Sequence, residues 1–79
     1  MRLDKYLKVS RIIKRRTVAN EACDGGRVQV NGRVAKASQE IKVGDEITIN
    51  FGNKDVKVRV LDVAETVRKE EAKEMFEYL

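Results

Sequence analysis

The fold depends on residues 16–34, RTVANEACDGGRVQVNGRV. Within them the spacing of the apolar residues changes from that of a helix to that of a strand. From Arg16 to Asp24, small apolar residues recur at helical spacing, which predicts a helix with a narrow apolar stripe formed by Val18, Ala19, Ala22 and Cys23. Gly25–Gly26 predicts the end of this helix, because glycine accepts the left-handed conformation that follows a last turn. Valines then alternate with polar residues, and Asn31–Gly32 has the turn chemistry of a two-residue hairpin.

The residues before this stretch predict a first helix over 3–9. Its buried face is formed by residues at i, i+3 and i+4, namely Leu3, Tyr6 and Leu7. Asp4 lies in the first turn, where the free backbone N–H groups favour a carboxylate. Ser10 is expected to end the helix, since its hydroxyl competes for backbone hydrogen bonds. We expect Ile12 and Ile13 to fill the corner between the two helices.

The residues after the hairpin predict two further strands and a last helix. Residues 46–51 and 56–60 alternate between apolar and polar side chains and are separated by a short turn, as in an antiparallel pair. From residue 67 the period is again helical, with one apolar face formed by Ala72, Met75, Phe76 and Leu79. The fold class is therefore α+β, a small single domain over residues 1–79 with a mainly antiparallel sheet and a C-terminal helix.

The composition limits the class of function. The chain has 79 residues, 42% hydrophobic and 38% charged, as expected of one small and rather polar domain. It contains no membrane-spanning apolar run. A single cysteine, Cys23, excludes an intramolecular disulfide and fits a reducing cytoplasm, and we expect it to be a small buried residue rather than a reactive thiol. Without histidine, a zinc site or a catalytic triad is not expected, and no phosphate-binding glycine loop occurs. We therefore expect no enzyme, no metal and no cofactor.

Positive charge is concentrated at the N-terminal end of the chain. Residues 1–16 carry +6 and the whole chain +4, so residues 17–79 carry −2. This segregation favours phosphate contact over a merely solvated face. The candidates are Arg2, Lys5, Lys8, Arg11, Lys14, Arg15 and Arg16. Arg16 and then Arg2 are the strongest, because a guanidinium pairs bidentately with phosphate oxygens. For Lys54, Lys57 and Arg59 a solvated strand face is the better interpretation.

The order of these pieces resembles a known family. Residues 2–49 contain RLDKYL, RR, GG-RVQVNG, K-x-S and VGDEI in sequence, a pattern similar to the S-four-type RNA-binding domain. The resemblance implies two helices packed on a small curved sheet, with RNA lying across the helical face. It adds Asp4 and Lys36, the lysine of K-x-S, to the RNA-binding candidates.

Within this family the chain is most similar to the RqcP type, short bacterial factors of ribosome-associated quality control related to heat-shock protein fifteen. Many family members have Ser or Thr at the position of Arg15, where a hydroxyl would cap the second helix. Here Thr17 is the alternative cap, and the double arginine Arg15–Arg16 favours the RqcP type. For Asp4 two interpretations stay open, a helix cap or a brace that orients Arg16 or another arginine.

The resemblance also implies partners. The RqcP type would bind ribosomal RNA and peptidyl-tRNA on large ribosomal subunits that carry a stalled nascent chain, alongside other quality-control factors, and support C-terminal tailing of that chain. We expect a monomer when free and no membrane partner. The alternatives are a subunit-recycling factor similar to heat-shock protein fifteen, the RNA-targeting domain of a modifying enzyme such as a pseudouridine synthase, and a protein-interaction module that uses the acidic tail.

Overall fold

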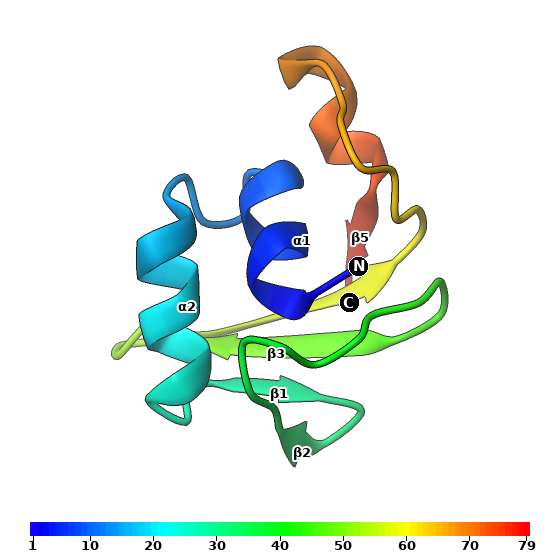
Figure 1. Cartoon of the computed structure of the whole chain (residues 1–79). Coiled ribbons are helices and arrows are strands. Elements are labelled where there is room, and N and C mark those ends of the chain that lie inside the picture. Colours follow the sequence, from blue (N-terminus) through cyan, green and yellow to red (C-terminus); the bar gives the residue numbers. More distant parts are fainter.

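The computed structural model describes all residues from 1 to 79 and has two helices packed on one face of a five-stranded antiparallel sheet (Figure 1). The sheet has the order β2-β1-β3-β4-β5, and every neighbouring pair is antiparallel. The elements are α1 (Leu3–Val9), α2 (Arg16–Asp24), β1 (Val28–Val30), β2 (Arg33–Val34), β3 (Glu46–Asn50), β4 (Asp55–Val60), the 3₁₀ helix η1 (Lys69–Glu74) and β5 (Phe76–Tyr78). The predicted α+β class is confirmed, with one correction at the C-terminus.

The first helix is held by its predicted apolar face. Leu3, Tyr6 and Leu7 are fully buried. The Tyr6 hydroxyl donates a 2.8 Å hydrogen bond to the carbonyl of Met75, which ties α1 to the C-terminal segment. Ser10 ends the helix as predicted, and its hydroxyl donates to the carbonyl of Leu7 at 3.3 Å. No helix of the molecule has the length and apolar character needed to cross a bilayer.

The second helix has the predicted bounds but a narrower apolar stripe. Ala19 and Cys23 are buried, whereas Val18 is 47% exposed. The face of α2 that packs against the core is narrow and includes only Ala19 and Cys23 among its fully buried residues. A side chain at Gly25 would place its Cβ 2.8 Å from the carbonyl oxygen of Glu21, so the last turn closes tightly over a glycine. Gly26 then has φ +82°, the predicted left-handed helix end.

One face of the sheet forms the side of the core opposite the helices. Asn31 and Gly32 have φ +53° and +84°, both positive as the predicted two-residue hairpin turn requires. In the central ladder Val30 pairs with Ile47 and Ile47 with Val58, so their side chains share one face of the sheet. The buried residues on this face are Val28, Val30, Ile47, Ile49, Val58 and Val60, and they pack in one cluster with α1 and α2.

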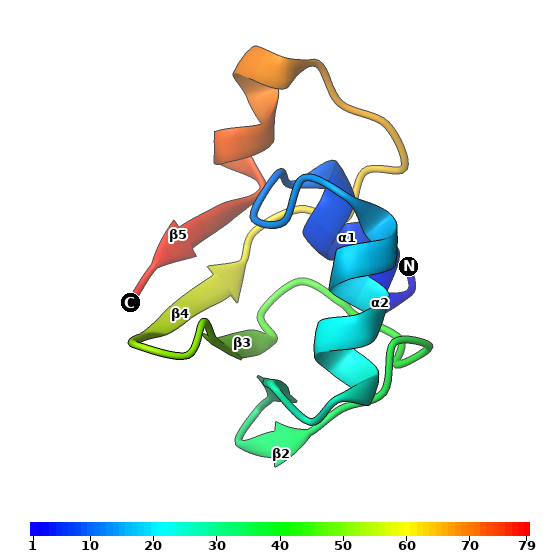
Figure 2. The same cartoon turned by 90° about the vertical axis from the view of Figure 1, so that its left-hand side faces the viewer.

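The C-terminal helix predicted from residue 67 is found only as a short 3₁₀ helix, and its predicted continuation to residue 79 is wrong. The chain forms the short η1 and then β5, which pairs with β4 at the edge of the sheet; Figure 2 shows η1 projecting above this edge. Without β5 the outer backbone groups of β4 would lack partners, and the bond from the Leu79 N–H to the Lys57 carbonyl (2.9 Å) extends this pairing. Of the predicted helical face, Ala72 and Met75 are buried, but Leu79 is 52% exposed.

Candidate nucleic-acid interface

The carboxylate of Asp4, in the first turn of α1, is the centre of the N-terminal charged cluster. Its side chain is only 3% exposed. It accepts hydrogen bonds from the backbone N–H of Lys5 at 2.8 Å and from the side-chain amide of Asn20 at 3.2 Å. Two guanidinium groups approach it as well, with Nε of Arg2 at 3.2 Å and Nε of Arg16 at 3.4 Å.

The N-cap position of α1 is held by Arg2 without a side-chain capping hydrogen bond, so Asp4 is not the helix cap, although it accepts from the Lys5 N–H in the first turn. Its contacts with two guanidinium groups have the geometry of the brace. Asp4 joins Arg2, which precedes α1, to Arg16, the first residue of α2. Both arginine side chains remain about half exposed, at 49% and 47%. Each guanidinium is thus fixed on one side by Asp4 and keeps exposed N–H groups on the other. Such an arrangement presents oriented donors to an anion.

The ionisation of Asp4 fits this role. Burial by itself would raise the pKa of the carboxyl group. The hydrogen bonds from Asn20, Arg16 and the Lys5 backbone, together with the charge of Arg16, outweigh it and lower the pKa below the usual 3.8. Asp4 is therefore ionised at neutral pH, and the two arginines face a full negative charge.

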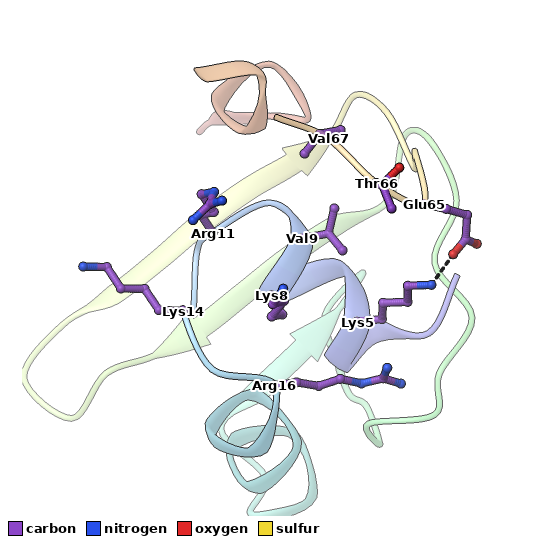
Figure 3. Close-up of a pocket in the computed structure, with 9 residues that line it drawn as sticks. All are labelled: Lys5, Lys8, Val9, Arg11, Lys14, Arg16, Glu65, Thr66 and Val67. Atoms are coloured by element: carbon purple, nitrogen blue, oxygen red, sulfur yellow. Dashed lines mark hydrogen bonds and ion pairs between the residues drawn. The ribbon is translucent and has the colours of Figure 1, made fainter. Parts of the chain in front are cut away.

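A surface groove of about 340 Å³ adjoins this cluster, and we call it the cationic groove. Five basic residues line it: Lys5, Lys8, Arg11, Lys14 and Arg16. They come from α1, the loop after it and the start of α2, as Figure 3 shows. The other lining residues are Val9, Glu65, Thr66 and Val67. The groove thus lies between the helical pair and the segment that leads to η1.

Glu65 is the one acidic residue in the cationic groove. Its carboxylate forms an ion pair with the ammonium group of Lys5 (Figure 3). The hydrogen bond from Lys5, and then its charge, lower the pKa of Glu65. The two residues are 60 positions apart. Sequence reasoning missed Glu65, because nothing local to residues 61–68 indicates that they approach α1.

The turn after α1 orients the middle of the groove. Arg11 has φ +63°, a left-handed conformation that is unfavourable for a non-glycine residue. The turn is anchored by the N–H of Arg11, which donates to the carbonyl of Lys8 at 3.0 Å, and by the buried Ile13, whose N–H donates to the carbonyl of Leu7 at 3.1 Å. Ile13 fills the corner as predicted, and Ile12 packs partly buried beside the core.

The structure does not bring every candidate to one place. Arg15 and Lys36 are exposed and do not line the cationic groove. Arg15 occupies the N-cap position of α2 without a capping hydrogen bond, so the predicted shift of the cap to Thr17 is not found. Asn20 was missed, although its position four residues after Arg16 puts both on one helical face and could have indicated it.

The basic residues on the sheet have local acidic partners. Lys57 Nζ lies 3.4 Å from the Glu46 carboxylate, and Arg59 donates to Glu77 at 3.0 Å and to Glu46 at 3.4 Å. All of these side chains are partly exposed. Their arrangement agrees with the solvated strand face predicted for Lys57 and Arg59.

Comparison with known proteins adds four findings. Residues 1–47 match the family model described as the S4 domain. The chain is 61% identical over 77 residues to the RQC P-site tRNA stabilizing factor of Halalkalibacterium halodurans, covering 98% of this chain and 88% of the relative. It is 56% identical over 79 residues to the same-named factor of Bacillus subtilis, covering 100% and 92%. Of solved structures, the trimeric heat shock protein 15 of Vibrio cholerae superimposes with a TM-score of 0.92 at 30% identity, covering 100% and 81%.

Proposed function

Because this chain belongs to the S4 domain family and, within it, to the RQC P-site tRNA stabilizing factors, we propose that it is an RNA-binding factor of ribosome-associated quality control. In this proposal it binds large ribosomal subunits that carry a stalled nascent chain, contacting ribosomal RNA and the peptidyl-tRNA in the P site. It thereby supports C-terminal tailing of the stalled chain, catalyses no reaction itself, and acts in the cytoplasm.

The observation that carries this proposal is the cationic groove beside two arginines braced by a buried carboxylate. Contacts to phosphate supply most of the affinity for structured RNA, and A-form helices are recognised largely by shape and backbone. A guanidinium already held by Asp4 loses less conformational freedom on binding than a free one. We infer that Arg2 and Arg16 set the register on the RNA and that the groove lysines add attraction.

Such a factor stabilises a tRNA by mass action rather than by chemistry. If it binds the subunit better when the tRNA occupies the P site, it shifts the tRNA toward that site by its differential affinity. A tenfold preference corresponds to about 1.4 kcal/mol. We further propose that the whole chain works as one domain, since one sheet joins residues 28–78 and both helices pack against it. We also propose that the protein is a monomer when free.

A second candidate function is subunit recycling of the heat-shock-protein-fifteen type. The TM-score of 0.92 with the Vibrio cholerae protein favours it, because the two proteins share one fold over the whole length of this chain. The identity of 61% with the tRNA stabilizing factor, against 30% with heat shock protein 15, favours the quality-control function. The two differ in the state of the subunit that is bound.

Sedimentation tests the proposed function. Tagged protein in a bacterial lysate is centrifuged through a sucrose gradient at low salt. In a second experiment the purified protein is centrifuged with large subunits that either carry peptidyl-tRNA or lack it. We expect the protein in large-subunit fractions and more of it where peptidyl-tRNA is present. Absence from these fractions would contradict the proposal, and equal binding to empty subunits would favour the recycling function.

A further inference from the structure

A second concave surface lies next to the cationic groove and has the opposite character. This aromatic hollow, of about 430 Å³, is lined by Ile12, Phe51, Val56, Phe76 and Tyr78, with Arg11 and Lys54 beside them. Two of its rings are well exposed, Phe51 at 44% and Tyr78 at 72%. A contiguous exposed apolar patch flanked by polar residues often marks an interaction or ligand-binding surface.

The hollow exists because the sheet extends beyond the helices. Side chains at alternate positions of β4 face the core, and Val58 and Val60 there are fully buried. Val56 lies on the same face one step further along the strand and is only half-buried. Tyr78 pairs with Val58 across the β4–β5 ladder yet remains exposed. The apolar face of the sheet thus continues past the end of the helical cover.

The rings are held in a defined arrangement. Phe76 and Tyr78 pack edge to face, with centroids 5.3 Å apart and ring planes at 88°. Phe76 is partly buried against the core, and its edge-to-face contact restricts the exposed Tyr78 ring. A flat partner can therefore stack on an aromatic surface that is partly ordered in advance.

Charge decides which partner fits. Arg11 lines both the cationic groove and the aromatic hollow, so the two surfaces are continuous. Lys54 adds a second cation, and no acidic residue lines the hollow. An apolar protein segment would need no flanking cations, whereas a nucleotide offers an aromatic base with phosphates on either side.

We propose that the aromatic hollow receives an unpaired nucleobase of the RNA strand whose phosphates lie in the cationic groove, with Tyr78 and Phe51 as stacking surfaces. The inference rests on the proposed RNA-binding function and deepens it. It adds a preference for RNA in which a single-stranded nucleotide adjoins a duplex.

Two RNA probes separate the two proposals. One is a short hairpin, and the other is the same hairpin with three unpaired adenosines at its 3′ end. We expect the protein to bind both, and the extension to lower the Kd about tenfold, within the range measured for stacking of a base on an aromatic side chain. The variants Tyr78→Ala and Phe51→Ala should each lose most of the extra affinity for the extended hairpin and still bind the plain hairpin. Tyr78→Phe should keep the extra affinity.

The control is Val34→Ala, which removes an exposed apolar side chain from the opposite edge of the sheet. Urea unfolding of each variant verifies that its fold is retained. Tyrosine emission gives an independent readout, because Tyr6 is fully buried and Tyr78 exposed. The extended hairpin should quench the emission of the wild-type protein, and Tyr78→Phe should bind equally well without this quenching.

Three results would overturn the inference. If the wild-type protein binds the two hairpins equally, or if both alanine variants keep the extra affinity, no base occupies the hollow. If those variants lose large-subunit binding with unchanged affinity for both hairpins, the hollow contacts a protein instead. If neither hairpin binds at any salt concentration, the proposed RNA-binding function fails and the base site fails with it.

Discussion

The guanidinium group of Arg16 lies 3.4 Å from the carboxylate of Asp4, which joins the start of α2 to the first turn of α1. The acid is buried and the base is half exposed, so the pair has one side in the core and one side at the surface. Replacing either residue should therefore affect a different property. In the proposed function, Asp4 contributes to stability and orientation, and Arg16 is the residue that contacts RNA.

Asp4→Asn should lower the free energy of unfolding at pH 7 by about 1–2 kcal/mol, because charge-assisted hydrogen bonds to a buried acceptor become neutral ones. Folding lowers the pKa of Asp4, so the ionised carboxylate stabilises the folded protein at pH values above the usual pKa of 3.8. This stabilisation is lost as the pH falls through the lowered pKa of the folded state. Urea unfolding at pH 7 and pH 3 measures both effects. The difference between wild type and Asp4→Asn should shrink at pH 3, and a constant difference would contradict this role.

Arg16→Ala should weaken RNA binding about tenfold and lower the unfolding free energy by less than about 1 kcal/mol. Asp4 would keep its bonds from Arg2, Asn20 and the Lys5 backbone, so its charge stays compensated. Fluorescence anisotropy with a labelled hairpin measures the affinity. The matched control is Arg33→Ala, an equal loss of charge at an exposed position on β2. Equal effects of the two variants would show that only net charge matters.

Glu65→Gln should strengthen RNA binding about twofold to fivefold, because Lys5 would no longer be paired across the cationic groove and the groove would become more positive. Titration with the same hairpin at low and high salt measures the change, which should diminish at high salt. Glu70→Gln makes the same change of charge on η1, outside the groove, and should leave the affinity nearly unchanged. A weaker complex after Glu65→Gln would mean that the ion pair helps to form the binding surface.

Cys23 should react slowly with a disulfide reagent in the folded protein. It is 1% exposed, and burial, followed by the negative charges of Asp4 and Asp24, raises its pKa to about 11. Since the thiolate is the reactive form, labelling at pH 8 should be at least about a hundredfold slower in the native state than in urea. Spectrophotometric labelling kinetics check this, and similar rates in both states would show that the thiol is accessible.

The parts of the fold that could be predicted are those with local signals. The bounds of α2 follow from its apolar spacing and from Gly26, and the hairpin follows from Asn31–Gly32, because each signal acts within a few residues. In the C-terminal segment the local signal is misleading. Ala72 and Met75 have helical spacing, but Phe76 pairs with Val60, and this contact with β4 decides the structure.

The same distinction applies to the site. The cluster of positive charge could be recognised from residues 2–16, since it is contiguous in the sequence. Its organisation could not, because Glu65 reaches Lys5 only through the fold. The aromatic hollow combines the loop after α1, the β3–β4 turn and β5, and the sequence assigned Phe76 to a helix.

In the proposed function, the cationic groove and the braced arginines bind RNA phosphates on the large ribosomal subunit. The most direct test is the affinity for purified large subunits carrying peptidyl-tRNA, measured between about 50 and 300 mM salt. With about five phosphate contacts, a plot of the logarithm of the association constant against the logarithm of the salt concentration should have a slope of about −4. Arg16→Ala should make this slope shallower by about one, to about −3. Binding that persists unchanged at high salt, with the same slope for both proteins, would show that phosphate contacts by these residues do not hold the protein on the subunit.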